Sequence, residues 1–255
     1  MLLPHRSIAL VLLGILFPQP EAAQGSARLA ERLGHWDAPF AHDLAGFGPA
    51  AVPFEAVHLA LIPRWSQRGS VLAWDLVGPQ ASAARDQRWS IVDARAEPPA
   101  FRNAELTLPA GAGDLFCAGH AWTSDGRLLV AGGTEDYPDG GHDGDFITGG
   151  RLLYFYDPGI GELGRWTRQL DLAVDRWYPS VLATGSGELL IAGGLDSRAR
   201  PAHTTYEEFP GDRSAAPGRG RRTARTLFAG PGGLAAEFEL YPRLHLLGSG
   251  EVFVV

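Results

Sequence analysis

The chain has 255 residues, of which 45% are hydrophobic and 20% charged, and this balance excludes wholesale disorder. Its 33 Gly and 19 Pro residues show no triplet period, which excludes collagen and favours a turn-dense all-β chain. The formal net charge of −7 argues against nucleic acid or an anionic membrane as a partner, because phosphate groups are bound by a basic face.

The N-terminus has the parts of an export signal. Residues 1–6 are a short positive start, residues 8–17 are apolar, and small residues around Gly25 offer a cleavage point. Ten apolar residues span about 15 Å as a helix, only half of a bilayer. We therefore predict a signal peptide at residues 1–25, with an uncleaved anchor as the alternative. A secreted or periplasmic protein follows, with no membrane contact after cleavage, and residues 26–53 are predicted to be a lead-in segment.

Cys117 is the single cysteine of the chain, so no intrachain disulfide can form in a compartment where disulfides are usual. A lone thiol there is buried and inert, paired between chains, or used chemically. Burial without reactivity is the commonest of these outcomes.

A short apolar strand recurs four times, with starts 57, 61 and 63 residues apart. The last three strands each follow a turn that ends in glycine, at Gly126, Gly187 and Gly250, and such turns supply the positive φ of a hairpin. Glycine pairs at 132–133 and 193–194 follow the second and third strands. The four strands are Val71–Trp74, Leu128–Ala131, Leu189–Ala192 and Val252–Val255.

A unit of β-hairpins repeated roughly every 50 to 60 residues and closed by glycine pairs is typical of kelch-type propeller blades. Residues 151–157 and 164–166 fit the outer two strands of one blade. We predict an all-β, incomplete kelch-type β-propeller over residues 54–255, with a β-sandwich as the alternative. The last strand stops without its glycine pair, and native chains usually cover such an edge. We therefore expect a piece of a longer protein.

Three residues occupy the same position in successive repeats. Cys117, Tyr178 and Tyr241 each lie eleven residues before one of the apolar strands. A propeller brings equivalent positions of adjacent blades side by side around its axis. This predicts that the Cys117 thiol and the Tyr178 phenol are neighbours, although they lie 61 residues apart. With a turn two residues longer, His58 takes the matching position in the first repeat.

Four motifs of the chain stand out, at Asp114–His120, Asp175–Ser180, Thr205–Pro210 and Leu240–His245. They resemble those of the glyoxal oxidase and galactose oxidase family of copper radical oxidases. The resemblance runs from Val57 to the end of the chain. It implies a seven-bladed kelch propeller, of which this chain would hold about four blades, followed by a β-sandwich domain in a missing C-terminal portion of the same protein.

The family's cofactor is a thioether between one Cys and one Tyr, and the resemblance places it on Cys117 and Tyr178, with Tyr178 also ligating copper. A thioether ortho to the phenol oxygen makes one-electron oxidation of the ring easier, and copper together with the radical forms a two-electron oxidant. The resemblance implies that Cys117 and Tyr178 are catalytic and bind the cofactor. It also implies that a small aldehyde or primary alcohol is oxidised while O2 is reduced to H2O2.

Some family features are absent from this chain. The remaining copper ligands, two imidazoles and an axial tyrosine, would lie beyond it, so we expect an incomplete copper site and no turnover by this chain alone. His120, three residues after Cys117, is expected to face the other way and to be a packed residue. Tyr241 is expected to be structural. Leu195 stands after the second glycine pair where the galactose oxidase branch has Trp, which favours the glyoxal oxidase branch.

A different class of function remains open. Kelch propellers also occur as scaffolds without chemistry, so the alternative is a secreted propeller that binds a glycan or protein. The oxidase requires a Cys117–Tyr178 cross-link, whereas the binding protein does not.

Overall fold

The computed structural model describes residues 54, 56–63, 69–75, 86–136, 147–196, 205–211, 225–226 and 240–254. All of them belong to one compact unit, His42–Val255. They form strands and turns without any helix, and so no helix in this described part could span a bilayer. The predicted signal peptide at 1–25 and the lead-in segment at 26–53 lie outside the described residues.

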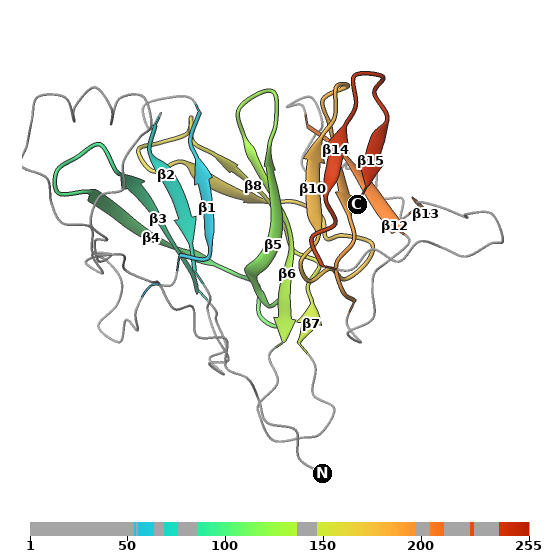
Figure 1. The fold of residues 1–255 in the computed structure, drawn as a ribbon. Coiled ribbons are helices and arrows are strands. Elements are labelled where there is room, and N and C mark those ends of the chain that lie inside the picture. Colours follow the sequence, from blue (N-terminus) through green and yellow to red (C-terminus); the bar gives the residue numbers. More distant parts are fainter. Residues whose placement is uncertain are drawn as a thin grey trace, which may run out of the picture. The chain divides into compact units, whose positions relative to one another are not determined.

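The first sheet is an antiparallel meander of four strands in the order β1-β2-β3-β4 (Figure 1). β2 is buried along most of its length, whereas β1 alternates buried and exposed side chains. Such alternation is expected for a strand with one covered face. The strands are β1 (His58–Leu61), β2 (Val71–Trp74), β3 (Asp86–Asp93) and β4 (Ala100–Thr107).

The second sheet repeats this plan in the order β5-β6-β8-β9, with the short strand β7 also paired to β6. The strands are β5 (Asp114–Trp122), β6 (Leu128–Asp136), β7 (Thr148–Gly149), β8 (Leu153–Asp157) and β9 (Arg165–Arg168). β8 and β9 are the outer pair of this sheet, as predicted for residues 151–157 and 164–166.

The third sheet has the order β10-β11-β12-β13, and a fourth consists of the pair β14-β15. Their strands are β10 (Ser180–Ala183), β11 (Glu188–Ala192), β12 (Thr205–Pro210), β13 (Arg225–Thr226), β14 (Leu244–Leu246) and β15 (Val252–Val254).

The expectation of an all-β chain is confirmed over the described residues, and each predicted repeat corresponds to one antiparallel sheet. The four predicted apolar strands coincide with β2, the start of β6, β11 and β15. Gly126, Gly187 and Gly250 have φ of 89°, 85° and 89°, as their hairpin turns require. A propeller needs its sheets arranged in a closed ring, and that arrangement stays a prediction.

Two hydrophobic clusters lie on the two faces of the second sheet. Leu128 and Val130 of β6 belong to one cluster, which includes side chains of the first sheet, and Leu129 and Ala131 belong to the other, with side chains of the third. Because both faces of β6 are covered, its apolar residues are consecutive rather than alternating. Each large side chain buried in this way stabilises the fold by roughly 1.5–3 kcal/mol.

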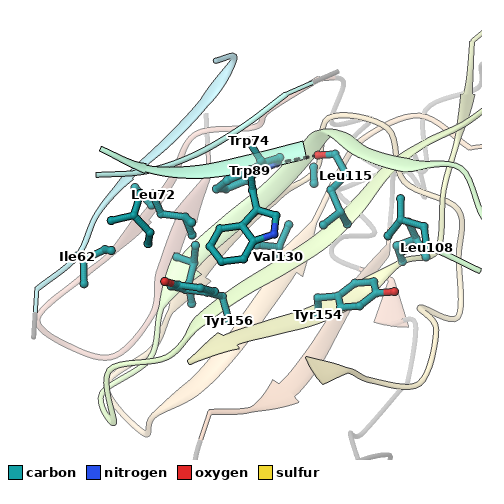
Figure 2. Packing of buried hydrophobic residues seen from close by; sticks show 14 residues of the cluster. Ile62, Leu72, Trp74, Trp89, Leu108, Leu115, Val130, Tyr154 and Tyr156 are labelled. Carbon is teal, nitrogen blue, oxygen red and sulfur yellow. Dashed lines mark hydrogen bonds between the residues drawn. The ribbon is translucent and has the colours of Figure 1, made fainter. Parts of the chain in front are cut away.

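The first cluster is rich in aromatic rings (Figure 2). Trp74 of β2 is fully buried, and its indole Nε1 donates a hydrogen bond of 3.1 Å to the Leu115 carbonyl of β5. This bond joins the first sheet to the start of the second, immediately beside Cys117.

Candidate functional site

Cys117, Tyr178 and Tyr241 share an unusual backbone conformation. Their φ angles are 62°, 61° and 46°, and they are the non-glycine residues with positive φ in the described part of the chain. This conformation costs a residue with a side chain roughly 1–2 kcal/mol. The shared conformation agrees with the equivalence that the repeat spacing predicts.

Main-chain hydrogen bonds join these positions from one sheet to the next. The Tyr178 N–H donates to the Cys117 carbonyl at 2.9 Å, and the Tyr241 N–H donates to the Tyr178 carbonyl at 2.8 Å. The predicted meeting of Cys117 with Tyr178 is therefore present in the structure. The N–H of Cys117 has a different kind of acceptor. It donates to the side chain of His58 in the first repeat, at Nε2, over 2.8 Å, and not to a main-chain carbonyl.

The thiol lies against the phenol. Cys117 is fully buried, and its thiol interacts with the side chain of Tyr178. Burial raises the pKa of the Cys117 thiol to about 12, although the contact with Tyr178 opposes this rise. Burial and the contact with Cys117 likewise raise the pKa of Tyr178 above its ordinary value. Both groups are neutral near pH 7, so Cys117 is not an anionic nucleophile.

Cys117 ends an irregular stretch of β5, where the register against β6 shifts between Asp114 and Ala118. Such a bulge leaves buried main-chain groups without strand partners. Here side chains bond five of the six N–H and C=O groups of residues 115–117, and the Tyr178 N–H bonds the sixth. The side-chain partners are Gln87 Oε1 for Leu115 N–H, Trp74 Nε1 for Leu115 C=O, Asp114 Oδ1 for Phe116 N–H, Thr134 Oγ1 for Phe116 C=O and His58 Nε2 for Cys117 N–H.

The segment that carries Tyr178 is held by a buried ion pair. Arg176 is fully buried, and its Nε lies 3.1 Å from Glu207 Oε1 of β12. Its other guanidinium nitrogens donate to the carbonyls of Gly193 at 2.7 Å and Thr205 at 3.1 Å. Burial lowers the pKa of Arg176, and Glu207 opposes this. A buried pair is tolerated when its polar atoms are satisfied in this way.

Two aromatic rings pack against the ring of Tyr178: that of Trp177, its neighbour in sequence, and that of Tyr241 from the next repeat. The Trp177 ring centroid lies 4.3 Å from that of Tyr178, and the Tyr241 centroid lies 4.7 Å away. Trp177 Nε1 donates to Thr134 Oγ1 at 3.2 Å, and both side chains also contact the Cys117 thiol. The sequence motifs contained Trp177, Arg176 and Glu207 without assigning them roles. The one signal in the sequence for a role of Arg176 was its charge, directly before Trp177 and Tyr178.

An open cavity of about 750 Å³ borders Tyr178 and Tyr241. His58, His120 and His245 also line it, whereas Cys117 is not among its lining residues. Of the Cys117–Tyr178 pair, the cavity therefore borders Tyr178 only. No acidic side chain is among the described residues that line it.

His120 borders this cavity and is also packed, as expected. Its ring lies edge-on to Trp74 at a centroid distance of 5.0 Å and to His58 at 5.8 Å. Burial lowers the pKa of His120, and a bond to the Leu59 backbone opposes this. Burial and then repulsion from His120 lower the pKa of His58 to about 3. Both imidazoles are therefore neutral near pH 7.

Tyr241 was expected to be structural, and its hydroxyl donates to the Ala118 carbonyl at 3.3 Å.

The residues at the site fit the expected Cys–Tyr thioether better than they fit the expected copper ion. A thiol in contact with a phenol is what a Cys–Tyr thioether requires, and Tyr178 is among the residues that line the cavity. Over the described residues, however, no group of three or more His, Cys, Asp and Glu side chains could hold a metal ion. This part of the chain thus brings a thiol and a phenol together but supplies no cluster of metal-binding side chains.

No protein-family model matches the chain, and no curated protein matches it. Among solved structures, it is similar to a fungal alcohol oxidase of the AA5 family in complex with copper, with a TM-score of 0.41 and 21% identity. The match covers 66% of this chain and 29% of the oxidase chain. The chain therefore spans less than a third of that protein.

Proposed function

We propose that this chain is the N-terminal propeller portion of a secreted copper radical oxidase, with Cys117 and Tyr178 forming a thioether cofactor. The substrate is a small aldehyde or primary alcohol, and O2 is reduced to H2O2. One observation carries the proposal: the buried Cys117 thiol lies against the Tyr178 phenol, although 61 residues separate them. A structural cysteine needs only apolar neighbours, whereas this thiol has a phenol, an indole and a hydroxyl around it.

The surroundings of the pair suit formation of the thioether. Sγ of Cys117 bonds the Tyr178 ring carbon next to the phenol carbon, and the thiol hydrogen and one ring hydrogen are lost. The two protons and two electrons reduce one O2 to H2O2. Burial of Cys117 keeps competing oxidants from the sulfur, and the bonded bulge keeps the two side chains in contact, so the reaction benefits from proximity.

When bound, copper together with the oxidised thioether supplies the two-electron oxidant of the proposed reaction. Tyr178 would hold the metal at the cavity, and the remaining ligands would come from outside the described residues. Trp177 and Tyr241 pack against the Tyr178 ring and restrict its movement. Arg176 fixes the main chain next to Trp177, so that the ring and the sulfur keep one relative position.

The proposal is tested by peptide mass spectrometry of the full-length protein after copper loading in air. We expect a pair of peptides joined through Cys117 and Tyr178 and lighter by two hydrogen atoms than their sum. The variants Cys117→Ser and Tyr178→Phe are the controls and should give only separate peptides. If both residues are unmodified in the copper-loaded protein, the oxidase proposal is wrong, and a propeller that binds a glycan or protein without catalysis is the better description.

A further inference from the structure

The first repeat contacts the bulge in a way that the later repeats do not. At Tyr178 and Tyr241 the main-chain N–H donates to a carbonyl of the preceding repeat. At Cys117 the acceptor is instead Nε2 of His58, at 2.8 Å. Among the three equivalent residues Cys117, Tyr178 and Tyr241, the N–H of Cys117 therefore bonds a histidine side chain, whereas the N–H groups of the two tyrosines bond main-chain carbonyls.

We propose that His58 is a positioning residue for the Cys117–Tyr178 pair: its Nε2 holds the Cys117 backbone in the conformation that directs the thiol at Tyr178. The inference rests on the proposed function for its chemical purpose. The positioning itself is a property of the folded chain and can be measured without copper.

The surroundings of His58 keep its ring in one orientation. The side chain is 4% exposed, and its ring stacks on Trp74 with centroids 4.8 Å apart and planes inclined by 8°. Phe116 contacts it edge-on at 6.3 Å. Trp74 itself donates to the Leu115 carbonyl, so the stacked rings hold both ends of the bulge. Nε2 can accept only when it carries no proton, and the lowered pKa of His58 keeps it in that state.

Loss of this acceptor has a defined consequence. The buried Cys117 N–H would be left without a partner, and an unsatisfied buried donor is strongly unfavourable. Cys117 also has the unfavourable φ of 62°. The φ penalty is relieved when φ of Cys117 returns to the ordinary negative region, and we expect this rotation to move the thiol away from Tyr178.

The first experiment uses copper-free, reduced protein and compares His58→Gln, His58→Leu and the control His120→Leu. The Gln amide oxygen can accept near the place of Nε2, whereas Leu fills the space without accepting. His120 packs on the same Trp74 ring but does not bond Cys117. The measurements are amide hydrogen exchange at Cys117 and the rate at which iodoacetamide alkylates its thiol, with urea unfolding as a check of global stability.

We expect His58→Leu to raise both rates at least about tenfold, as loss of one buried hydrogen bond implies. His58→Gln should restore most of the protection, and His120→Leu should stay within about twofold of the wild type. The inference is wrong if His58→Leu leaves both rates unchanged, or if His120→Leu raises them equally, since a general loss of packing would then explain the effect.

A second experiment separates this inference from the proposed function. In the copper-loaded full-length protein, His58→Leu should form the Cys117–Tyr178 cross-link at least tenfold more slowly than the wild type, and His58→Gln at a rate close to it. An equal rate in His58→Leu overturns the positioning role. If the wild type forms no cross-link while His58→Leu exposes the thiol, the oxidase proposal fails and the positioning of Cys117 by His58 stands.

Discussion

At the residue scale, the site depends on three side chains held in a backbone conformation that most residues avoid. The positive φ of Cys117, Tyr178 and Tyr241 costs roughly 1–2 kcal/mol at each residue. Such a conformation persists only where the surrounding structure supplies compensating bonds. For Cys117 these bonds come from His58, from the Tyr178 N–H and from the bulge as a whole.

The buried His58 makes the stability of the fold depend on pH. Its pKa is lowered from about 6.5 in an unfolded chain to about 3 in the folded protein. The unfolded state therefore binds more protons between these values, and the stabilisation that is present above pH 6.5 is lost as the pH falls towards 3. We predict that the free energy of unfolding in urea decreases from pH 7.5 to pH 5.

The variant His58→Gln is the matched test of this assignment, because glutamine does not titrate. It should show a smaller decrease between pH 7.5 and pH 5 than the wild type. His120, whose pKa is lowered in the same direction, remains in both proteins, so its own titration is present in both measurements. Identical slopes in the two proteins would show that His58 is not the buried neutral imidazole described above.

At the element scale, the contact of Cys117 with Tyr178 requires β5 to approach the start of β10 closely. Gly119 permits this approach, because a Cβ at that position would lie 2.4 Å from the Pro179 carbonyl oxygen. The obstacle is main chain, which cannot rotate away as a flexible side chain does.

We predict that Gly119→Ala separates the two strands and lowers the free energy of unfolding by about 1–3 kcal/mol. It should also slow formation of the Cys117–Tyr178 cross-link. Gly185→Ala is the control, since a Cβ there meets no atom within 4 Å. Urea unfolding and peptide mass spectrometry measure the two effects. Equal stability of both variants would contradict the close approach of β5 to Pro179.

At the scale of the whole molecule, Arg176 connects the second and third sheets. Its main-chain N–H donates to the Gly150 carbonyl and its own carbonyl accepts from the Gly133 N–H, both at 3.0 Å. Gly133 belongs to β6 of the second sheet, and Gly150 directly follows β7. Its guanidinium binds Glu207 and Thr205 of the third sheet. The residue therefore holds the position of Trp177 and Tyr178 relative to both sheets.

We predict that Arg176→Met destabilises the protein by about 3–5 kcal/mol, because Glu207 is then left as a buried charge without its partner. The control is Arg168→Met, which removes the exposed ion pair of Arg168 with Asp171 and should cost less than about 1 kcal/mol. Urea unfolding compares the two. Similar losses would show that the Arg176–Glu207 pair does not hold the sheets together.

The sequence by itself determined the four apolar strands, their glycine turns and the equivalence of Cys117, Tyr178 and Tyr241. Apolar runs and glycine turns are local signals, and a fixed spacing from each strand places equivalent residues at equivalent points of successive sheets. The outer strand pair β8–β9 was predictable for the same reason. The same spacing places His58 at the equivalent position of the first repeat, if the turn of that repeat is two residues longer.

Only the tertiary structure decided which groups complete the site. His58 Nε2 bonds the Cys117 N–H, Thr134 bonds both the bulge and Trp177, and Arg176 pairs with Glu207. These partners lie on different strands and far apart along the chain. The bulge in β5 and the packing of the sheets determine which of these side chains lie within bonding distance. A local pattern of residue types contains no information about that distance.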